Sequence, residues 1–336
     1  MKLNDVVVLR AIATIEVVAF HAYGFLGHKA HFPTMNDIYH NMYPYANNAN
    51  SGFFSIRMPL FIFISGFLFS FLLKKEKYHD TFKFFTEKLR RLLLPYCIFC
   101  AIFMLSRGEF SVPKLLEGNY LHLWFLPMLF WCFLITYTLH KIFNRIKCCE
   151  SCILSITFGL TYLDIFIPNF MGLGLINNWL YWFYLGYIIF KFKNTILEYI
   201  TNYKLYLLLS VLYVGGNIFF SANDLLNLHT INILIRTSGI LLIWYFINIL
   251  LKYKNGKWAE YKIFSEINRC SYGIYVYHYW LQTYMISQTA KSIFHLEKLA
   301  EHVILFPILY TIASLIISYF ATHITLKTRV GKYLLG

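Results

Sequence analysis

The stretch VVVLRAIATIEVVAFHAYGF (residues 6–25) is long enough to cross a membrane as a helix, yet it carries Arg10, Glu16 and His21. A helix of about 20 apolar residues spans the core of a bilayer. Charged and titratable groups are costly at that depth, and they usually face the interior of a helix bundle or a wet cavity. The stretch therefore indicates a membrane protein and raises the question of what its polar face does.

Segments of the same kind recur along the whole chain. Hydrophobic residues make up 58% of the 336 residues and charged residues only 14%, whereas soluble domains have about 25% charged residues. The apolar runs are continuous rather than alternating, which favours helices over strands. The sequence predicts an all-α, polytopic transmembrane helical bundle of about ten spans, placed at residues 6–26, 53–73, 92–106, 121–140, 152–167, 177–190, 205–221, 230–251, 270–289 and 302–324.

The organisation is expected to be simple. The sequence has no internal repeat and no linker rich in proline or glycine. We therefore predict a single integral-membrane domain over residues 1–336. Because the chain ends shortly after the last predicted span, no fused extracytoplasmic domain is expected.

Basic residues indicate the orientation in the membrane. Lysine and arginine gather in segments 74–91 and 252–269, with smaller groups in alternate loops, while the intervening loops hold few. By the positive-inside rule, both termini face the cytoplasm of a multi-pass protein in the cell (inner) membrane, surrounded by membrane lipids. The net charge of +14 is then mostly a topological feature. Nucleic-acid binding is not expected, since the basic residues are scattered over short loops.

The first predicted span presents Arg10 and His21 on one face. They are eleven residues apart, which corresponds to about three turns and roughly 16 Å along a helix. A cation near the cytosolic end and an imidazole deeper in the membrane suit an anionic donor whose reactive end points at a base. Glu16 lies on another face. For Glu16, Asp164 and Arg236 we favour pairing between helices over a role in chemistry.

A second candidate is RCSYGIYVYHYWLQ (residues 269–282), in which polar residues recur at helical spacing. Ser271, Tyr275, His278 and Gln282 fall on one face. Two interpretations remain open for this stripe. It lines a cavity, or it forms a hydrogen-bonded seam between helices.

A third candidate is FTEKLRRLLLPY (residues 85–96), where Arg90 and Arg91 precede the third predicted span. Arginine binds phosphate bidentately and stays charged. Flanking arginines are also the usual cytoplasmic anchors of a span. By itself the arginine pair does not favour phosphate binding over a role as a cytoplasmic anchor.

Several motifs, in this order, resemble the membrane acyltransferase-3 family of O-acyltransferases. They cover most of the chain, from residue 10 to about residue 280, and each is weak alone. The motifs are LRAIATIEVVAFH (9–21), MPLFIFISGFLFS (58–70), KLRRLLLPY (88–96), LHLWFLPMLF (121–130) and CSYGIYVYHYW (270–280). Glu16 departs from the family pattern, in which this position is usually apolar, so its role stays open.

The resemblance implies transfer of an acyl group, most often acetyl, from cytosolic acyl-CoA (acetyl-CoA) to a hydroxyl of a cell-surface glycan or lipid-linked sugar precursor. It implies that His21 acts as base or acyl-handling residue, with His278 as a second polar group of the reaction chamber. It also implies five residues for the donor: Arg10, Arg90 and Arg91 at the coenzyme phosphates, and Ser65 and Gly66 along the donor path. Some stand-alone members of the family are assigned succinyl transfer, which is an alternative here.

The main alternative function belongs to another class of membrane protein. A glycan flippase or transporter also places ionisable residues inside its spans, although the lack of an internal repeat counts against it. The loop 27–52 is rich in Asn, Tyr and His; it contacts sugars or is simply solvated. His28, His31 and His40 in this loop match no standard metal-site spacing, so no metal is expected.

Overall fold

The computed structural model describes residues 3–26, 53–146, 150–163, 168–200, 203–222, 229–286 and 305–336. Every regular element in these ranges is helical, which confirms the all-α prediction for them. The helices are α1 (Asn4–Leu26), η1 (Phe53–Ile56), α4 (Arg57–Lys74), α5 (Thr81–Lys88), η2 (Leu89–Leu93), α6 (Leu94–Ser106), α7 (Val112–Glu117), η3 (Leu121–Trp124), α8 (Phe125–Ile146), α9 (Glu150–Leu160), η4 (Leu173–Leu175), α10 (Ile176–Lys191), α11 (Lys193–Ile200), α12 (Tyr203–Ser210), η5 (Val211–Gly215), α13 (Gly216–Ala222), α14 (His229–Lys252), η7 (Tyr253–Glu260), α15 (Lys262–Trp280), η8 (Leu281–Ile286), α18 (Leu305–Thr325) and α19 (Arg329–Leu335).

The helices have the length and composition of a membrane protein. Within the described ranges, six helical segments are long and apolar enough to cross a bilayer: Asn4–Gly24, Arg57–Lys74, Thr81–Ser106, Leu121–Ile142, His229–Lys252 and Leu305–Thr325. The remaining predicted spans coincide with α9, α10, the run α12–η5–α13, and α15 with η8. The polytopic helical class is therefore confirmed, and the number of about ten spans stays a prediction.

The third predicted span begins earlier than expected, inside the basic segment. Helix starts at Thr81 and continues through η2 to Ser106. Asp80 caps it, because its carboxylate accepts hydrogen bonds from the backbone N–H groups of Phe82 and Lys83 at 2.8 and 3.4 Å. Phe84 is buried and stacks on Tyr137 of α8 at 4.2 Å between ring centroids. Capping by Asp80 and burial of Phe84 therefore allow the helix to begin inside the basic segment 74–91.

The chain divides into two compact units. Unit 1 comprises Met1–Leu60 with Tyr199–Thr328, and unit 2 comprises Phe61–Glu198 with Arg329–Gly336. The boundary falls near the start of α4. The single-domain organisation over residues 1–336 stays a prediction. The loop 27–52, with its three histidines, and Asp164 lie outside the described residues.

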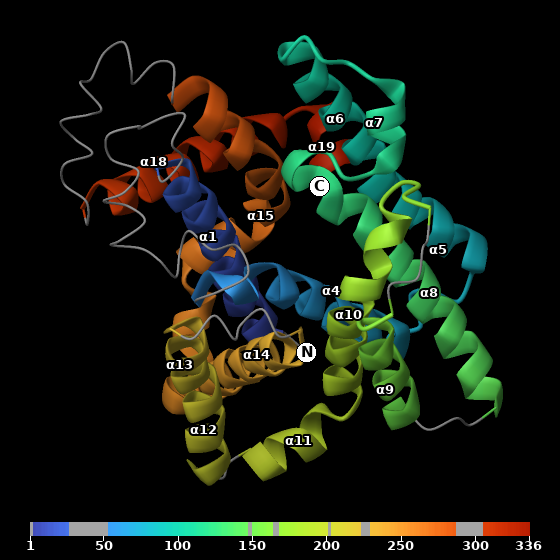
Figure 1. The fold of residues 1–336 in the computed structure, drawn as a ribbon, viewed down its shortest axis with the longest axis vertical. Helices are drawn as coiled ribbons and strands as arrows, with labels where there is room; N and C mark the ends of the chain where they lie inside the picture. Colours follow the sequence, from blue (N-terminus) through green and yellow to red (C-terminus); the bar gives the residue numbers. More distant parts are fainter. Residues whose placement is uncertain are drawn as a thin grey trace. The chain divides into compact units, whose positions relative to one another are not determined.

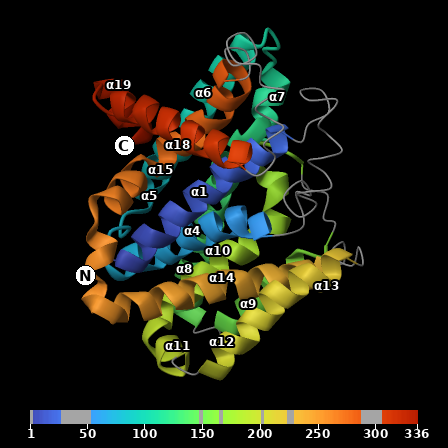
Figure 2. The same cartoon turned by 90° about the vertical axis from the view of Figure 1, so that its left-hand side faces the viewer.

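In unit 1, helices α1, α15 and α18 pack against one another (Figures 1 and 2). Val18 of α1 and Cys270 and Ile274 of α15 form a buried apolar cluster between these helices. A second layer forms where α14 packs along α1 and α12. Thus α1 is held on two sides, and its polar side chains face neighbouring helices instead of lipid alone.

Unit 2 has an aromatic core. Phe69 of α4 is fully buried and contacts the rings of Phe84, Phe133 and Phe183 at 5.3 to 5.9 Å between centroids. Aromatic pairs at this spacing add to the stabilisation from apolar burial. Helices α4, α5, α8 and α10 each contribute a ring, so the core fixes the position of α4.

Candidate active site

Helix α1 carries the two residues that the sequence singles out first. Arg10 and His21 are both partly buried side chains of this single helix. Because both residues lie on one continuous helix, the Arg10 cation stands about three turns before the His21 imidazole, as the spacing predicts. Around His21, the neighbours Val18 and Ala22 are buried, so this part of α1 lies inside unit 1.

The structure brings His21 together with His278 of α15. The two imidazole rings lie 5.2 Å apart between centroids and are inclined by 44°. Tyr279 packs its ring edge-on against His21 at 5.0 Å. His278 is completely buried. Two histidines from helices far apart in the sequence thus form one cluster in the interior of unit 1.

The hydrogen bonds of His278 define its tautomer. Its Nδ1 lies 2.7 Å from the carbonyl oxygen of Tyr275 and 3.0 Å from that of Ile274. A carbonyl oxygen only accepts, so Nδ1 must carry the proton and donate it. In the neutral ring, Nε2 is then the nitrogen with a lone pair. His278 is consequently oriented by its own helix and offers a basic nitrogen.

The rest of the polar stripe on α15 favours the seam interpretation. Gln282 donates from Nε2 to the carbonyl oxygen of Val18 at 3.2 Å, which ties η8 to α1. Its Oε1 is enclosed and has no hydrogen-bond partner among the described residues. Ser271 donates to its own helix, at the carbonyl oxygen of Asn268. Within the stripe, Gln282 therefore links η8 to α1, and His278 is the member that reaches His21.

In unit 2, the predicted donor-binding arginines lie on a π-helical turn. Arg90 and Arg91 belong to η2 (Leu89–Leu93), between α5 and α6. π-Helical turns are rare and are frequent at functional sites. Arg90 lies over the ring of Tyr333 at 5.0 Å, and its Nε is enclosed without a hydrogen-bond partner in the described part of the chain. Arg91 is exposed.

Sequence reasoning missed Lys88, next to this pair. Lys88 is buried, and its ammonium lies 3.5 Å from the ring centroid of Phe133 and 5.1 Å from that of Tyr78. Aromatic faces attract cations, and the effect is stronger away from water. The basic segment alone did not reveal the contact with Phe133, because that ring comes from α8, far along the chain from Lys88.

Ser65 and Gly66 have packing roles on α4. The hydroxyl of Ser65 donates to the carbonyl oxygen of Phe61 in its own helix at 2.9 Å. A Cβ at Gly66 would overlap the backbone carbonyl of Phe183, and one at Gly186 would overlap that of Phe63. Helices α4 and α10 therefore approach backbone to backbone at these glycines. Their part in a donor path stays a prediction.

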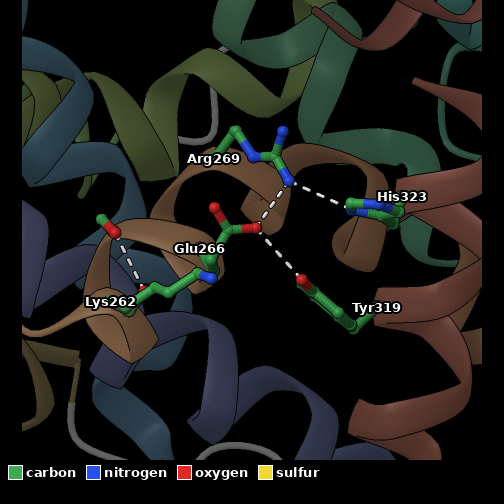
Figure 3. A network of polar contacts seen from close by, with 6 residues as sticks. Lys262, Glu266, Arg269, Tyr319 and His323 are labelled. Carbon is green, nitrogen blue, oxygen red and sulfur yellow. Dashed lines mark hydrogen bonds and ion pairs between the residues drawn. The ribbon is translucent and has the colours of Figure 1, made fainter. Parts of the chain in front are cut away.

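A further polar cluster joins α15 to α18 (Figure 3). Glu266 accepts hydrogen bonds from Arg269 at 2.5 Å and from the hydroxyl of Tyr319 at 3.0 Å, and Arg269 also donates to Nδ1 of His323 at 3.0 Å. Burial raises the pKa of Glu266, but the hydrogen bonds from Arg269 and Tyr319 outweigh it, so the pKa is lowered. Figure 3 shows these side chains converging from the two helices, which orients α15 relative to α18.

The predicted site residues thus fall into two groups. Arg10, His21 and His278 belong to unit 1, where the two histidines meet. Ser65, Gly66, Arg90 and Arg91 belong to unit 2. The roles assigned to all seven residues by resemblance stay predictions.

An apolar helical fold with two histidines in contact, one of them fully buried, defines a polytopic membrane protein with a candidate interior site. The family model described as an acyltransferase domain, that of the acyltransferase-3 family, matches residues 3–323, nearly the whole chain. The chain belongs to this family, as its motifs indicate, and is a membrane acyltransferase. No curated protein and no solved structure matches the chain.

Proposed function

We propose that this acyltransferase moves an acyl group, most often acetyl, from cytosolic acyl-CoA to a hydroxyl of a cell-surface glycan or lipid-linked sugar precursor. The observation that supports it best is the contact of His278, from α15, with His21 of α1, the helix that also carries Arg10. A base and a cation on one membrane helix, with a second imidazole from α15 beside the base, suit an anionic thioester that presents its acyl end there.

The chemistry follows from the residues in place. A sugar hydroxyl is a weak nucleophile near neutral pH, so His21 removes its proton as the oxygen attacks the thioester carbonyl. The C–S bond then breaks, an ester forms, and the proton held by His21 passes to the thiolate of the coenzyme. General base catalysis of this kind contributes about 10²–10⁴-fold in rate. His278, with Nδ1 occupied by its own helix, presents a second basic nitrogen close by.

Binding of the acyl-CoA donor is assigned mainly to basic residues. The family resemblance assigns Arg10, Arg90 and Arg91 to the phosphates of the coenzyme, to which arginine can bind bidentately, and Ser65 and Gly66 to the path of its acyl arm. This assignment requires both termini to face the cytoplasm of a cell-membrane protein, which the distribution of basic residues supports. Burial of the thioester in the bundle keeps water from it.

The test is acyl transfer by purified, reconstituted protein. Wild type is expected to move label from acetyl-CoA into glycan isolated from the host surface, and His21→Ala should lower the rate about 10²–10⁴-fold. His79→Ala, an exposed histidine between α4 and α5, is the matched control and should transfer normally. Succinyl-CoA is run in parallel to identify the acyl group.

Three outcomes would contradict parts of the proposal. Equal transfer by wild type and His21→Ala would reduce His21 to a packing residue. Transfer from succinyl-CoA alone would replace acetyl by succinyl. Movement of glycan across the membrane without any acyl transfer would favour the flippase alternative.

A further inference from the structure

Gln282 uses only one end of its side-chain amide within the part of the chain that the structure describes. The residue is 1% exposed, and its Nε2 donates to the carbonyl oxygen of Val18 on α1 at 3.2 Å. Because a carbonyl oxygen only accepts, this bond fixes which end of the amide faces Val18. The other end, Oε1, is enclosed and has no hydrogen-bond partner among the described residues. The interior of unit 1 therefore contains a hydrogen-bond acceptor that awaits a donor.

This acceptor belongs to the same helix contact as the candidate base. Gln282 follows His278 by four residues on the continuous stretch of α15 and η8, so the two are neighbours on one face, with Cβ atoms about 5–6 Å apart. On α1, Val18 precedes His21 by three residues, and these two are neighbours in the same way.

Two contacts one turn apart thus join the same two stretches of helix. His278 meets His21 at 5.2 Å between ring centroids, and Gln282 meets the backbone of Val18. One turn of helix is about 5.4 Å long. A molecule of the size of a sugar ring can therefore touch both His21 and the amide of Gln282.

The chemistry of the site selects a hydroxyl group for Oε1. An unsatisfied buried acceptor carries a free-energy penalty, which a ligand that brings a donor removes. The proposed acyl acceptor brings hydroxyl groups, whereas an acetyl group has no hydrogen-bond donor. A hydroxyl holds only one proton. Since the reacting hydroxyl gives its proton to His21, the hydrogen bond to Oε1 has to come from a second hydroxyl.

We propose that Gln282 is a binding residue for the acyl acceptor and that this acceptor presents two neighbouring hydroxyl groups. One hydroxyl faces His21 and is acylated, and the other donates to Oε1 of Gln282. This inference rests on the proposed function. It adds a specificity: an acceptor whose second hydroxyl is missing or blocked binds poorly. An N–H group of the coenzyme arm offers the same kind of donor, and the experiment distinguishes that source from the acceptor.

The test compares two ring alcohols that differ by one hydroxyl. The compound trans-cyclohexane-1,2-diol has two neighbouring hydroxyls, and cyclohexanol has one. Each is added as an inhibitor of label transfer from acetyl-CoA to the host glycan, catalysed by full-length protein in lipid nanodiscs. For wild type we expect the diol to inhibit at a concentration at least about 10-fold lower, because a site that hydrogen-bonds a hydroxyl rejects the analogue without it.

Variants of Gln282 should abolish this preference. In Gln282→Leu the acceptor atom is gone, so the two alcohols should inhibit about equally. If Gln282→Leu does not fold, Gln282→Met keeps the length of the side chain and should give the same loss. Comparison of the two alcohols on each variant cancels their different partition into lipid.

Tyr310→Phe is the matched control for a purely structural role. The hydroxyl of Tyr310 donates to the backbone carbonyl oxygen of Gln282 at 2.9 Å. Its removal disturbs the same turn of η8 but leaves Oε1 in place. Tyr310→Phe should therefore unfold at a lower temperature than wild type and still prefer the diol.

The outcomes separate this inference from the proposed function. Equal inhibition of wild type by the two alcohols, or an unchanged preference in folded Gln282→Leu or Gln282→Met protein, would overturn the inference while acyl transfer stands. If the preference persists and KM for acetyl-CoA rises, Oε1 binds an N–H of the coenzyme arm instead. A wild-type protein that transfers no acyl group to the glycan would overturn the proposed function, and this inference with it.

Discussion

Single side chains in unit 1 are oriented by the helices that carry them. His278 points its Nδ1 at the carbonyl oxygens of its own helix, which leaves the other ring nitrogen as the basic one. Its ring also contacts that of His21. The orientation of His278 therefore bears directly on the reaction, even though the hydrogen bonds that set it are local.

Replacement of His278 by Asn tests whether the basic nitrogen of His278 takes part in the reaction. The Asn amide can still donate to its own helix, but the basic nitrogen is lost. We expect kcat for acyl transfer to fall roughly 10- to 100-fold, with a smaller change in KM and a displaced pH–rate profile. Steady-state kinetics over a pH series give the answer, with His79→Asn as control. An unchanged profile would show that His278 serves packing only.

Glu266 provides a second test at this scale, through pH. Because its pKa is lowered in the folded protein, its ion pair stabilises the fold above the ordinary carboxyl pKa of about 4.3. The contribution is lost as the pH falls through the lowered value. For Arg269→Gln we expect unfolding free energy to decrease by about 0.2–1 kcal/mol at pH 7, as for other exposed pairs.

The measurement is thermal unfolding of solubilised protein at pH 7 and at decreasing pH below 4.3. The difference between Arg269→Gln and wild type should shrink as the pH falls. Lys257→Gln removes one exposed cation of the same unit and is the control. A difference that grows on acidification would contradict the assigned sign.

At the scale of elements, close helix contact depends on glycine. Helices α4 and α10 meet where Gly66 faces the backbone of Phe183 and Gly186 faces that of Phe63. No flexible side chain is present there to give way. The contact therefore sets the distance between the two helices and supports the aromatic core beside it.

Gly66→Ala should consequently destabilise unit 2. Added volume in a packed interior costs about 1–3 kcal/mol, and a backbone neighbour places this site at the upper end. Gly159→Ala on α9, where a Cβ meets nothing within 4 Å, should be neutral or stabilising by up to about 1 kcal/mol. Thermal unfolding in detergent compares the two. Equal stability of both variants would show that the helices separate easily.

At the scale of the whole molecule, the orientation in the membrane decides from which side the donor arrives. Basic residues predict that the segment between α4 and α5 is cytoplasmic and that residues 107–120 are external. In a background with all seven cysteines replaced by serine, Lys114→Cys should react with an impermeant maleimide on intact cells. His79→Cys should react only after permeabilisation. The reverse pattern would invert the topology and the proposed side of the coenzyme.

Much of the fold follows from local sequence. Apolar runs of the right length predict helices wherever they occur, and this held for the described part of every predicted span except the fifth, where α9 ends at Leu160. Boundaries were less accurate: the helix beginning at Thr81 extends into a charged segment, because Asp80 caps it and Phe84 is buried against Tyr137. Caps and tertiary burial outweigh the hydropathy pattern at such ends.

By itself the sequence determined the membrane class, the family and the shared face of Arg10 and His21, because helical periodicity is a local property of the chain. The tertiary structure decided which faces meet. It places His21 against His278, and Arg57 over the ring of Phe20. These partners are distant in sequence, and hydropathy does not distinguish one apolar helix neighbour from another. Only the packing of whole helices selects among them.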